Sequence, residues 1–270
     1  MSGPVRLEYR NVTMHFATGG GQKTLTAVSD VSFSVRDGEV VSLIGPSGCG
    51  KSTLLNIGSG LVAPSAGDAV VDGGRVEGPN AHVAFMLQKD LLLPWRTVVE
   101  NVMFGVEIQG VPPGPRRARA QALLDAFNLA EFANRYPYQL SGGMRQRVAL
   151  ARTLAVDPSV LLLDEPFSAV DAQTRMVLQR DLAQTLKRAR KTALLITHDL
   201  LEAVTLSDRV LVMSRRPGRI IDEIEIDLPR REDPIVRRQD TRVTAYMTRL
   251  MDRLDIGGMA LDESKDGGAA

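Results

Sequence analysis

The sequence predicts an α/β protein whose core is a mostly parallel β-sheet, with a small antiparallel sheet beside it and an inserted helical subdomain. Several short apolar runs, too brief for helices, are typical of buried parallel strands. Helical patterns lie between most of these runs, which is the alternation expected of an α/β sheet. Two early segments alternate apolar and polar residues instead, and this pattern favours antiparallel strands with one exposed face.

The five runs assigned to the parallel core are residues 40–44, 82–87, 160–163, 193–196 and 210–213. The two alternating segments are residues 7–13 and 28–35. Among the helices that separate the core strands, we expect one after Gly50 and another over residues 173–190.

A long insertion that is mostly helical follows the second core strand. Thr97 and Glu100 form a capping-box pattern that begins a helix, and Gly110 ends it. Residues 111–115 are rich in proline and glycine and predict a break. Helical patterns resume over residues 116–127 and again after Gly143.

These patterns divide the chain into four parts. We expect a core over residues 1–88 and 158–230 that includes the N-terminal antiparallel sheet, and a helical subdomain over residues 89–157. A C-terminal helical extension is expected over residues 231–256. Its apolar residues recur at helical spacing, which favours packing on the body over docking on a partner: they are Val243, Met247, Leu250, Met251 and Leu254. The Gly-rich, polar end, residues 257–270, predicts a disordered tail.

Composition limits the possible functions. The 270 residues are 44% hydrophobic and 24% charged, as in an ordinary globular protein. No apolar run approaches the roughly 20 residues that span a bilayer, so membrane association is expected through a partner. The net charge of +1 gives no reason to expect nucleic acid as a partner, and a single cysteine excludes an internal disulfide.

The strongest local motif follows the first core strand and matches G-x-x-x-x-G-K-[ST]. Its residues are Gly45, Pro46, Ser47, Gly48, Cys49, Gly50, Lys51, Ser52 and Thr53. Glycines let such a loop aim its N–H groups at phosphate oxygens, and the next helix adds a positive dipole. Lys51 would reach the β- and γ-phosphates and Ser52 would bind Mg²⁺, whereas the Cys49 side chain is interpreted as a packing residue. The motif predicts a P-loop NTPase (RecA-like) core that binds a nucleoside triphosphate.

Two carboxylates, Asp164 and Glu165, follow the strand at residues 160–163. Ligands of open α/β sheets bind at this carboxyl end. The pair resembles a Walker B motif, in which Asp164 would hold Mg²⁺ and Glu165 would polarise the attacking water. Together with the phosphate loop, the pair predicts a magnesium-dependent nucleoside triphosphatase.

Residues 140–147, Leu-Ser-Gly-Gly-Met-Arg-Gln-Arg, closely resemble the signature motif of ABC ATPases. Ser141, Gly142 and Gly143 offer a hydroxyl and free N–H groups at a second helix N-terminus. The resemblance implies a head-to-tail dimer in which each signature covers the ATP bound by the other subunit's phosphate loop. Many relatives carry Gln where this chain has Met144, which leaves the backbone chemistry of the signature complete.

Other positions follow in the family's order. Gln88 resembles the Q-loop glutamine, which senses Mg²⁺ and the attacking water. Asp171, at the end of a D-loop-like segment, would communicate across the dimer. His198 resembles the switch histidine that contacts the γ-phosphate, although a histidine after a strand is more often structural when taken alone.

Three of the aromatic residues that precede the first core strand compete for the role of stacking on adenine. Phe16 is favoured for this role, with Tyr9 and His15 as alternatives.

The resemblance implies the ATPase subunit of an importer, peripheral on the cytoplasmic face of the bacterial inner membrane. Its partners would be two transmembrane permease subunits and, indirectly, an extracytoplasmic substrate-binding protein. The apolar segment at residues 91–95 is expected to contact the permease, or else Trp95 packs under the insertion. Pro94-Trp95, the Met variant of the signature and residues 215–220 resemble the ATPases of nitrate, sulfonate and taurine importers.

Three other functions remain open on the sequence. The first is an ABC transporter ATPase for another substrate. The second is a soluble ABC ATPase of DNA repair or translation, which the single cassette and short insertion disfavour. The third is a nucleotide-binding subunit without turnover, which the complete set of catalytic residues disfavours.

Overall fold

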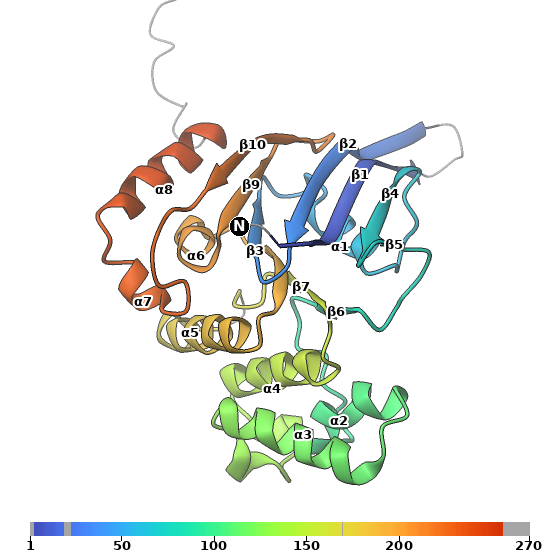
Figure 1. The fold of residues 1–270 in the computed structure, drawn as a ribbon, viewed down its shortest axis with the longest axis vertical. Coiled ribbons are helices and arrows are strands. Elements are labelled where there is room, and N and C mark those ends of the chain that lie inside the picture. Colours follow the sequence, from blue (N-terminus) through green and yellow to red (C-terminus); the bar gives the residue numbers. More distant parts are fainter. Residues whose placement is uncertain (1–2, 19–22, 169, 256–270) are drawn as a thin grey trace, which may run out of the picture.

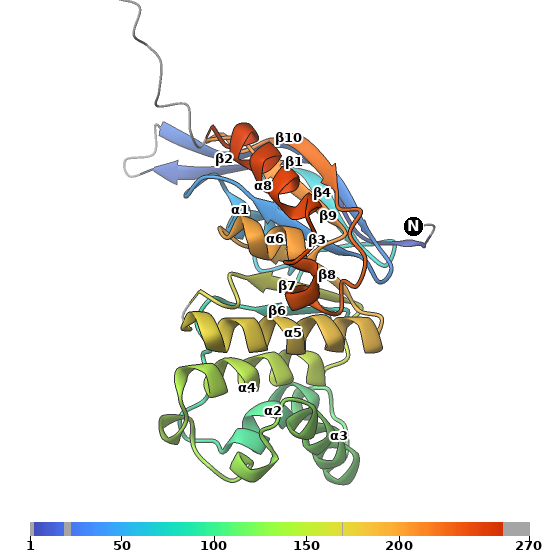
Figure 2. The same ribbon diagram turned by 90° about the vertical axis from the view of Figure 1, so that its left-hand side faces the viewer.

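The computed structural model describes residues 3–18, 23–168 and 170–255. Two sheets and a group of helices form the molecule: a six-stranded sheet at its centre, a four-stranded antiparallel sheet on one side, and a helical subdomain on the other (Figures 1 and 2). No helix among the described residues combines the length and apolar character needed to cross a bilayer.

The central sheet has the strand order β10-β9-β3-β8-β7-β6. Five of its strands are parallel: β3 (Val40–Ile44), β6 (Val83–Met86), β7 (Val160–Asp164), β8 (Thr192–Ile196) and β9 (Arg209–Met213). The prediction of these five strands is confirmed, with bounds that differ by one residue at some ends. A sixth strand, β10 (Ile220–Glu225), pairs antiparallel with β9 at the edge and was not predicted.

The second sheet contains β1 (Val5–Thr18), β2 (Lys23–Arg36), β4 (Ala66–Val71) and β5 (Gly74–Arg75), all antiparallel. β1 and β2 extend well beyond the two alternating segments that predicted them. Helix α1 (Lys51–Gly58) packs on β1 and β4 of this sheet and on β7 of the other, so an apolar cluster fills the space between the sheets.

Three helices fall inside the expected insertion: α2 (Val98–Ile108), α3 (Pro113–Ala126) and α4 (Gly142–Ala155). The capping box at Thr97 and Glu100 is present. The predicted break ends early, because Pro113 occupies the first turn of α3, where a missing N–H costs nothing. Two 3-10 turns, η1 (Ala130–Phe132) and η2 (Pro137–Gln139), precede α4.

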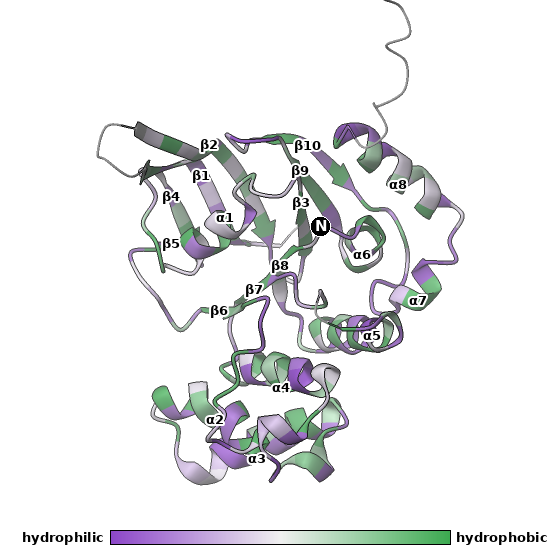
Figure 3. Ribbon diagram, turned by 180° about the vertical axis from the view of Figure 1, so that it is seen from behind, coloured by the Kyte–Doolittle hydropathy of each residue, from purple (hydrophilic) through white to green (hydrophobic). Residues whose placement is uncertain are grey.

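The remaining helices cover the central sheet. They are α5 (Ala172–Arg188), α6 (Leu200–Leu206), α7 (Pro234–Arg237) and α8 (Arg242–Arg253). Hydrophilic and hydrophobic residues alternate along α8 (Figure 3), which buries Val243 and Leu250 against α6 and the strands β9 and β10. Met251, expected on this packing face, is 37% exposed, so that assignment was wrong. The predicted disordered tail lies outside the described residues.

Candidate nucleotide-binding site

The phosphate loop connects β3 to α1, and its shape requires glycine. Gly50 has φ +105°, and a Cβ there would lie 2.4 Å from Cγ1 of Val28. The side chain of Cys49 is buried in the cluster between the sheets, in agreement with its interpretation as a packing residue. Loop residues Ser47, Gly48, Gly50, Lys51, Ser52 and Thr53 line a cavity of about 290 Å³.

Lys51 is folded back on its own loop. Its Nζ donates to the carbonyl oxygens of Gly45 and Pro46 at 2.7 and 3.1 Å. Because these acceptors are neutral, an incoming phosphate would offer the ammonium group a stronger, charge-assisted hydrogen bond. The position of Lys51 therefore suits an anion-binding role.

The two carboxylates lie at the carboxyl end of β7, next to this loop. Burial raises the pKa of Asp164, and a hydrogen bond with the Ser52 side chain opposes the rise. Glu165 has φ +45°, a left-handed conformation that is unfavourable for a non-glycine residue. Glu165 also lines the cavity of the phosphate loop.

Two side chains converge on one oxygen of Glu165. Gln88 donates from Nε2 to Oε2 of Glu165 at 3.2 Å, and Nδ1 of His198 lies 3.2 Å from the same oxygen. Gln88 follows β6 and His198 follows β8, the strands on either side of β7. The parallel sheet therefore brings together three residues that are 77 and 33 positions apart.

The oxygen ligands at this edge fit Mg²⁺. Among the described residues, no cluster of three or more His, Cys, Asp or Glu side chains could hold a metal by itself. Mg²⁺ commonly takes one or two carboxylates and completes its shell with water and substrate phosphates. The buried carboxyl of Asp164 with the Ser52 hydroxyl is such a partial shell, and a cation there would compensate the unfavourable burial of charge.

The structure separates the three aromatic candidates for adenine stacking. Phe16 lines the cavity and is 40% exposed. Tyr9 is buried, donates its hydroxyl to the carbonyl of Leu54 and stacks on Phe33, so it is inaccessible to a ligand. His15 contacts the Thr26 hydroxyl through Nδ1 and does not line the cavity.

The signature residues lie elsewhere. Ser141 caps α4 by accepting a hydrogen bond from the backbone N–H of Met144, and it is exposed. Gly142 lines a different cavity, between α4 and the segment that follows Gln88. Asp171 caps α5 in the same way, through the N–H of Thr174. The cavity of the phosphate loop therefore lacks the signature of its own chain.

Helix α4 nevertheless contacts the loops that follow β6 and β7. The buried side chain of Gln146 donates from Nε2 to the carbonyl oxygens of Pro166 and Gln88, at 2.7 and 3.4 Å. These two carbonyls lie just after Glu165 and at Gln88 itself, so one α4 residue contacts both strand-end loops.

Sequence reasoning missed three residues of the cavity wall: Leu25, Ala27 and Arg216. Leu25 and Ala27 belong to β2, where apolar residues at alternate positions are typical of any strand and do not indicate ligand contact. Arg216 lies in a segment that the sequence singled out only for its resemblance to a transporter subgroup.

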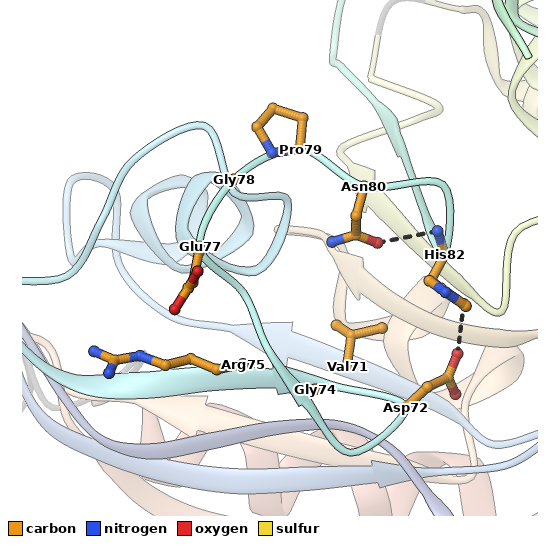
Figure 4. Close-up of a pocket in the computed structure, with 9 residues that line it drawn as sticks. All are labelled: Val71, Asp72, Gly74, Arg75, Glu77, Gly78, Pro79, Asn80 and His82. Atoms are coloured by element: carbon orange, nitrogen blue, oxygen red, sulfur yellow. Dashed lines mark hydrogen bonds and ion pairs between the residues drawn. The ribbon is translucent and has the colours of Figure 1, made fainter.

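A separate cavity of about 430 Å³ opens beside β5, and Figure 4 shows its residues. Its polar side chains bind one another: His82 pairs with Asp72 at 3.0 Å, and the side-chain oxygen of Asn80 accepts from the N–H of His82. None of the predicted site residues lines it, so the candidate site is the cavity of the phosphate loop.

Known proteins resemble this chain over most of its length. The family model described as ABC transporter matches residues 28–168. An uncharacterised ABC transporter ATP-binding protein of Methanocaldococcus jannaschii is 46% identical, covering 85% of both chains. A taurine import ATP-binding protein of Pseudomonas entomophila is 46% identical over 76% of this chain and 79% of its own.

An aliphatic sulfonates import ATP-binding protein of Burkholderia cenocepacia is 46% identical over 84% of this chain and 81% of its own. Among solved structures, the dimeric ATP-binding cassette MJ0796 in a post-hydrolysis state with ADP and phosphate is 32% identical, with a TM-score of 0.72. That match covers 82% of this chain and 98% of the cassette. Shared fold, shared sequence and a complete phosphate loop lead to one conclusion: the chain belongs to the ABC transporter family, as an ATP-binding subunit that hydrolyses ATP.

Proposed function

We propose that two copies of this chain pair head to tail around two molecules of Mg·ATP and energise import of a small anion through partner permeases. The observation that carries the pairing is the separation of the two anion-binding helix starts. The phosphate loop and Glu165 share one cavity, whereas Gly142 lines another. A signature from a second copy would complete each site, and the solved cassette MJ0796 is itself dimeric.

Within each site the residues have distinct tasks. Lys51 and the backbone N–H groups of residues 47–53 bind the phosphates, and Phe16 stacks on adenine. Ser52 and Asp164, with Gln88 nearby, would hold Mg²⁺, which when bound supplies positive charge to the phosphate oxygens. Glu165 orients the attacking water and accepts its proton.

Gln88 and His198 position Glu165 through their contacts with its Oε2 atom. His198 is exposed enough to reach a γ-phosphate as well. The signature of the second copy, Ser141 to Gly143, binds the same phosphate from the opposite side, and Asp171 lies at the contact between copies. Binding of ATP therefore stabilises the closed pair, and loss of the γ-phosphate reopens it.

The partner permeases would contact the segment after Gln88. Leu91 and Trp95 are exposed there, and Trp95 is 72% exposed, which disfavours its packing under the insertion. Arg152 of α4 holds the backbone of this segment through the carbonyls of Asp90 and Leu91. The complex would lie on the cytoplasmic face of the bacterial inner membrane and receive cargo from an extracytoplasmic binding protein.

For the cargo we propose a small anion such as nitrate, a sulfonate or taurine. The names of the relatives from Pseudomonas and Burkholderia support the last two. No residue of an ATPase subunit is expected to touch the cargo, so the assignment depends on these likenesses.

The test is ATP hydrolysis by the complex reconstituted in vesicles with its permeases. Binding proteins loaded with nitrate, taurine or an alkyl sulfonate are added, and we expect one of them to stimulate hydrolysis and uptake. Stimulation only by a cationic or sugar-loaded protein would contradict the cargo assignment. Co-purification with nucleic acid or ribosomes, and not with membrane subunits, would favour the soluble alternatives.

Pairing is tested separately in the Glu165→Gln variant. An ATP analogue with a photoreactive γ-phosphate should label the peptide that contains Ser141 of the second copy. Labelling confined to the copy that binds the nucleotide would rule out the shared site.

A further inference from the structure

Arg216 lies in the cavity of the phosphate loop, although no motif assigns it there. It belongs to the arginine loop, residues 214–219, which follows β9. Arg216 lines the same cavity as Phe16, Lys51 and Glu165. Its guanidinium donates from Nε and Nη2 to the carbonyl oxygen of Gly48, at 3.0 and 2.7 Å. One side chain thus holds the turn of the phosphate loop from outside.

The backbone of the arginine loop is fixed independently of this side chain. The N–H of Gly218 donates to the carbonyl of Ala27, and its carbonyl accepts from the N–H of Ser29, at 2.9 and 3.0 Å. Gly218 also packs against the phosphate loop so closely that a Cβ would lie 2.0 Å from the carbonyl oxygen of Cys49. A change at Arg216 therefore leaves the loop anchored.

The charge of Arg216 is not compensated within the part of the chain that the structure describes. Arg209, at the start of β9, pairs with Glu39 and Glu223. The contacts of Arg216, in contrast, go to one neutral carbonyl. A guanidinium has five N–H donors, and two serve Gly48, which leaves three for another acceptor. Such a group beside a phosphate loop suits a polyphosphate ligand.

We propose that Arg216 is a further nucleotide-binding residue, which holds the phosphate loop at Gly48 and binds the polyphosphate of ATP with its remaining N–H groups. The inference rests on the proposed nucleotide site and adds to it a residue from a loop outside the motifs. The proposed role also explains why position 216 of the arginine loop is positively charged.

The test compares Arg216→Met with Arg219→Met. Methionine keeps most of the aliphatic stem and removes the charge. Arg219 is in the same loop but contacts Ser29 and does not line the cavity, so it is the matched control. Dissociation constants for ATP, ADP and AMP are measured by calorimetry, and thermal melting verifies folding.

We expect Arg216→Met to weaken ATP binding about tenfold, ADP binding less and AMP binding least, because a lost charge matters more for a more charged ligand. Added salt should reduce the difference in ATP affinity between Arg216→Met and the native protein. Arg216→Lys should recover part of the affinity, and Arg219→Met should stay within about twofold of the native value. Arg216→Gln should show the same order of affinity losses for ATP, ADP and AMP as Arg216→Met. If Arg216→Met does not fold, Arg216→Gln is measured in its place.

Equal losses for all three nucleotides, or equal effects at Arg216 and Arg219, would overturn the assignment. Lys51→Ala is measured in parallel. If it loses ATP binding while Arg216→Met keeps it, only the role of Arg216 fails. If both bind ATP normally, the proposed nucleotide site itself is wrong.

Discussion

Glu165 has two neighbours that restrict where its carboxylate can point. Gln88 and His198 both contact Oε2 of its carboxylate. A carboxylate held in this way is positioned before substrate arrives, which general base catalysis requires. The neighbouring Asp164 bonds to Ser52 instead, so we expect the two adjacent carboxylates to serve different purposes.

Glu165→Gln tests this division. We expect ATP hydrolysis to fall at least about 100-fold, because the amide cannot accept a proton. ATP binding should be kept and trapped dimers should accumulate. Hydrolysis of ATP, nucleotide affinity and size-exclusion chromatography measure the three properties. Glu77→Gln, an exposed residue outside the site, is the control, and normal turnover in Glu165→Gln would remove Glu165 from its role.

Residues of the site differ in how far sequence could reveal them. The phosphate loop and the acidic pair are local motifs, because their chemistry needs particular residues at fixed spacing. The contact of Arg216 with Gly48 joins positions 168 apart in the chain, and nothing local announces it. The sequence favoured Phe16 but left Tyr9 as an alternative, and the burial of Tyr9 excludes it.

At the scale of elements, the start of α4 presents backbone without steric hindrance. Apart from the adjoining residues and the backbone of α4 itself, the described part of the chain places only Nη2 of Arg145 within 4 Å of a Cβ built on Gly142, at 3.9 Å. An alanine therefore fits the single chain, and a methyl group would harm only something that approaches from outside.

Gly142→Ala should leave monomer folding unchanged or raise its stability by up to about 1 kcal/mol, since alanine favours helix. ATP hydrolysis should nevertheless fall at least about tenfold, because the methyl group would separate the signature from the nucleotide of the other copy. Thermal melting and hydrolysis are compared with Gly114→Ala, which is equally open at the start of α3. Full activity in Gly142→Ala would contradict close approach of the second copy.

The buried carboxyl group of Glu202 connects α6 with α5 and with the end of β8, close to His198. Glu202 of α6 accepts a hydrogen bond from Gln179 of α5 at 2.9 Å, and its side chain also bonds to Thr197, next to His198. The pKa of Glu202 is raised to about 7, chiefly by burial; the hydrogen bonds with Thr197 and Gln179 oppose the rise, and the smaller effects of Asp199 and Arg175 raise and lower the pKa respectively. The folded protein therefore binds a proton that the unfolded chain releases near its ordinary pKa of about 4.5.

The stability from this proton is complete below pH 4.5 and is lost as pH rises through about 7. Relative to Glu202→Gln, the native protein should lose about 2–3 kcal/mol of unfolding free energy between pH 5 and pH 8. Urea unfolding at both pH values measures the difference. The exposed variant Glu77→Gln should keep the native slope, and identical slopes in Glu202→Gln and the native protein would contradict a raised pKa.

Helices and strands could be predicted from the sequence where residues close together in the chain indicate them. The five core strands and the capped helix α2 were predicted because burial and capping appear in the residues themselves. β4, β5 and β10 were missed, since each pairs antiparallel with a strand that the pattern alone does not identify as its partner. The prolines that suggested a break at residues 111–115 instead begin α3, because proline is unfavourable inside a helix but suited to its first turn.

For the whole molecule, the exposed segment after Gln88 is where a partner would attach. Trp95 and Ile108 are both 72% exposed in the helical subdomain, so neither is needed for its core. They differ in position, because Trp95 follows Gln88 closely and Ile108 ends α2.

Trp95→Ala should leave melting and the hydrolysis by the isolated subunit unchanged, because surface substitutions usually change stability by less than about 0.5 kcal/mol. Coupled uptake by the reconstituted complex should fall at least about tenfold, as expected when a tryptophan is removed from the centre of an interface. Ile108→Ala is the matched control and should keep uptake. Intact assembly and uptake in Trp95→Ala would exclude the permease contact.

The amide of Gln146 has a mechanical consequence. Its Nε2 donates to the carbonyl of Pro166, next to Glu165, and to the carbonyl of Gln88, where the segment that leads to Trp95 begins. We therefore expect a tilt of the three inserted helices to displace both loops. A protein bound to the surface of these helices is then expected to change the rate of ATP hydrolysis without contacting the nucleotide. A single nitrogen atom, Nε2 of Gln146, therefore links the inserted helices to both loops of the site.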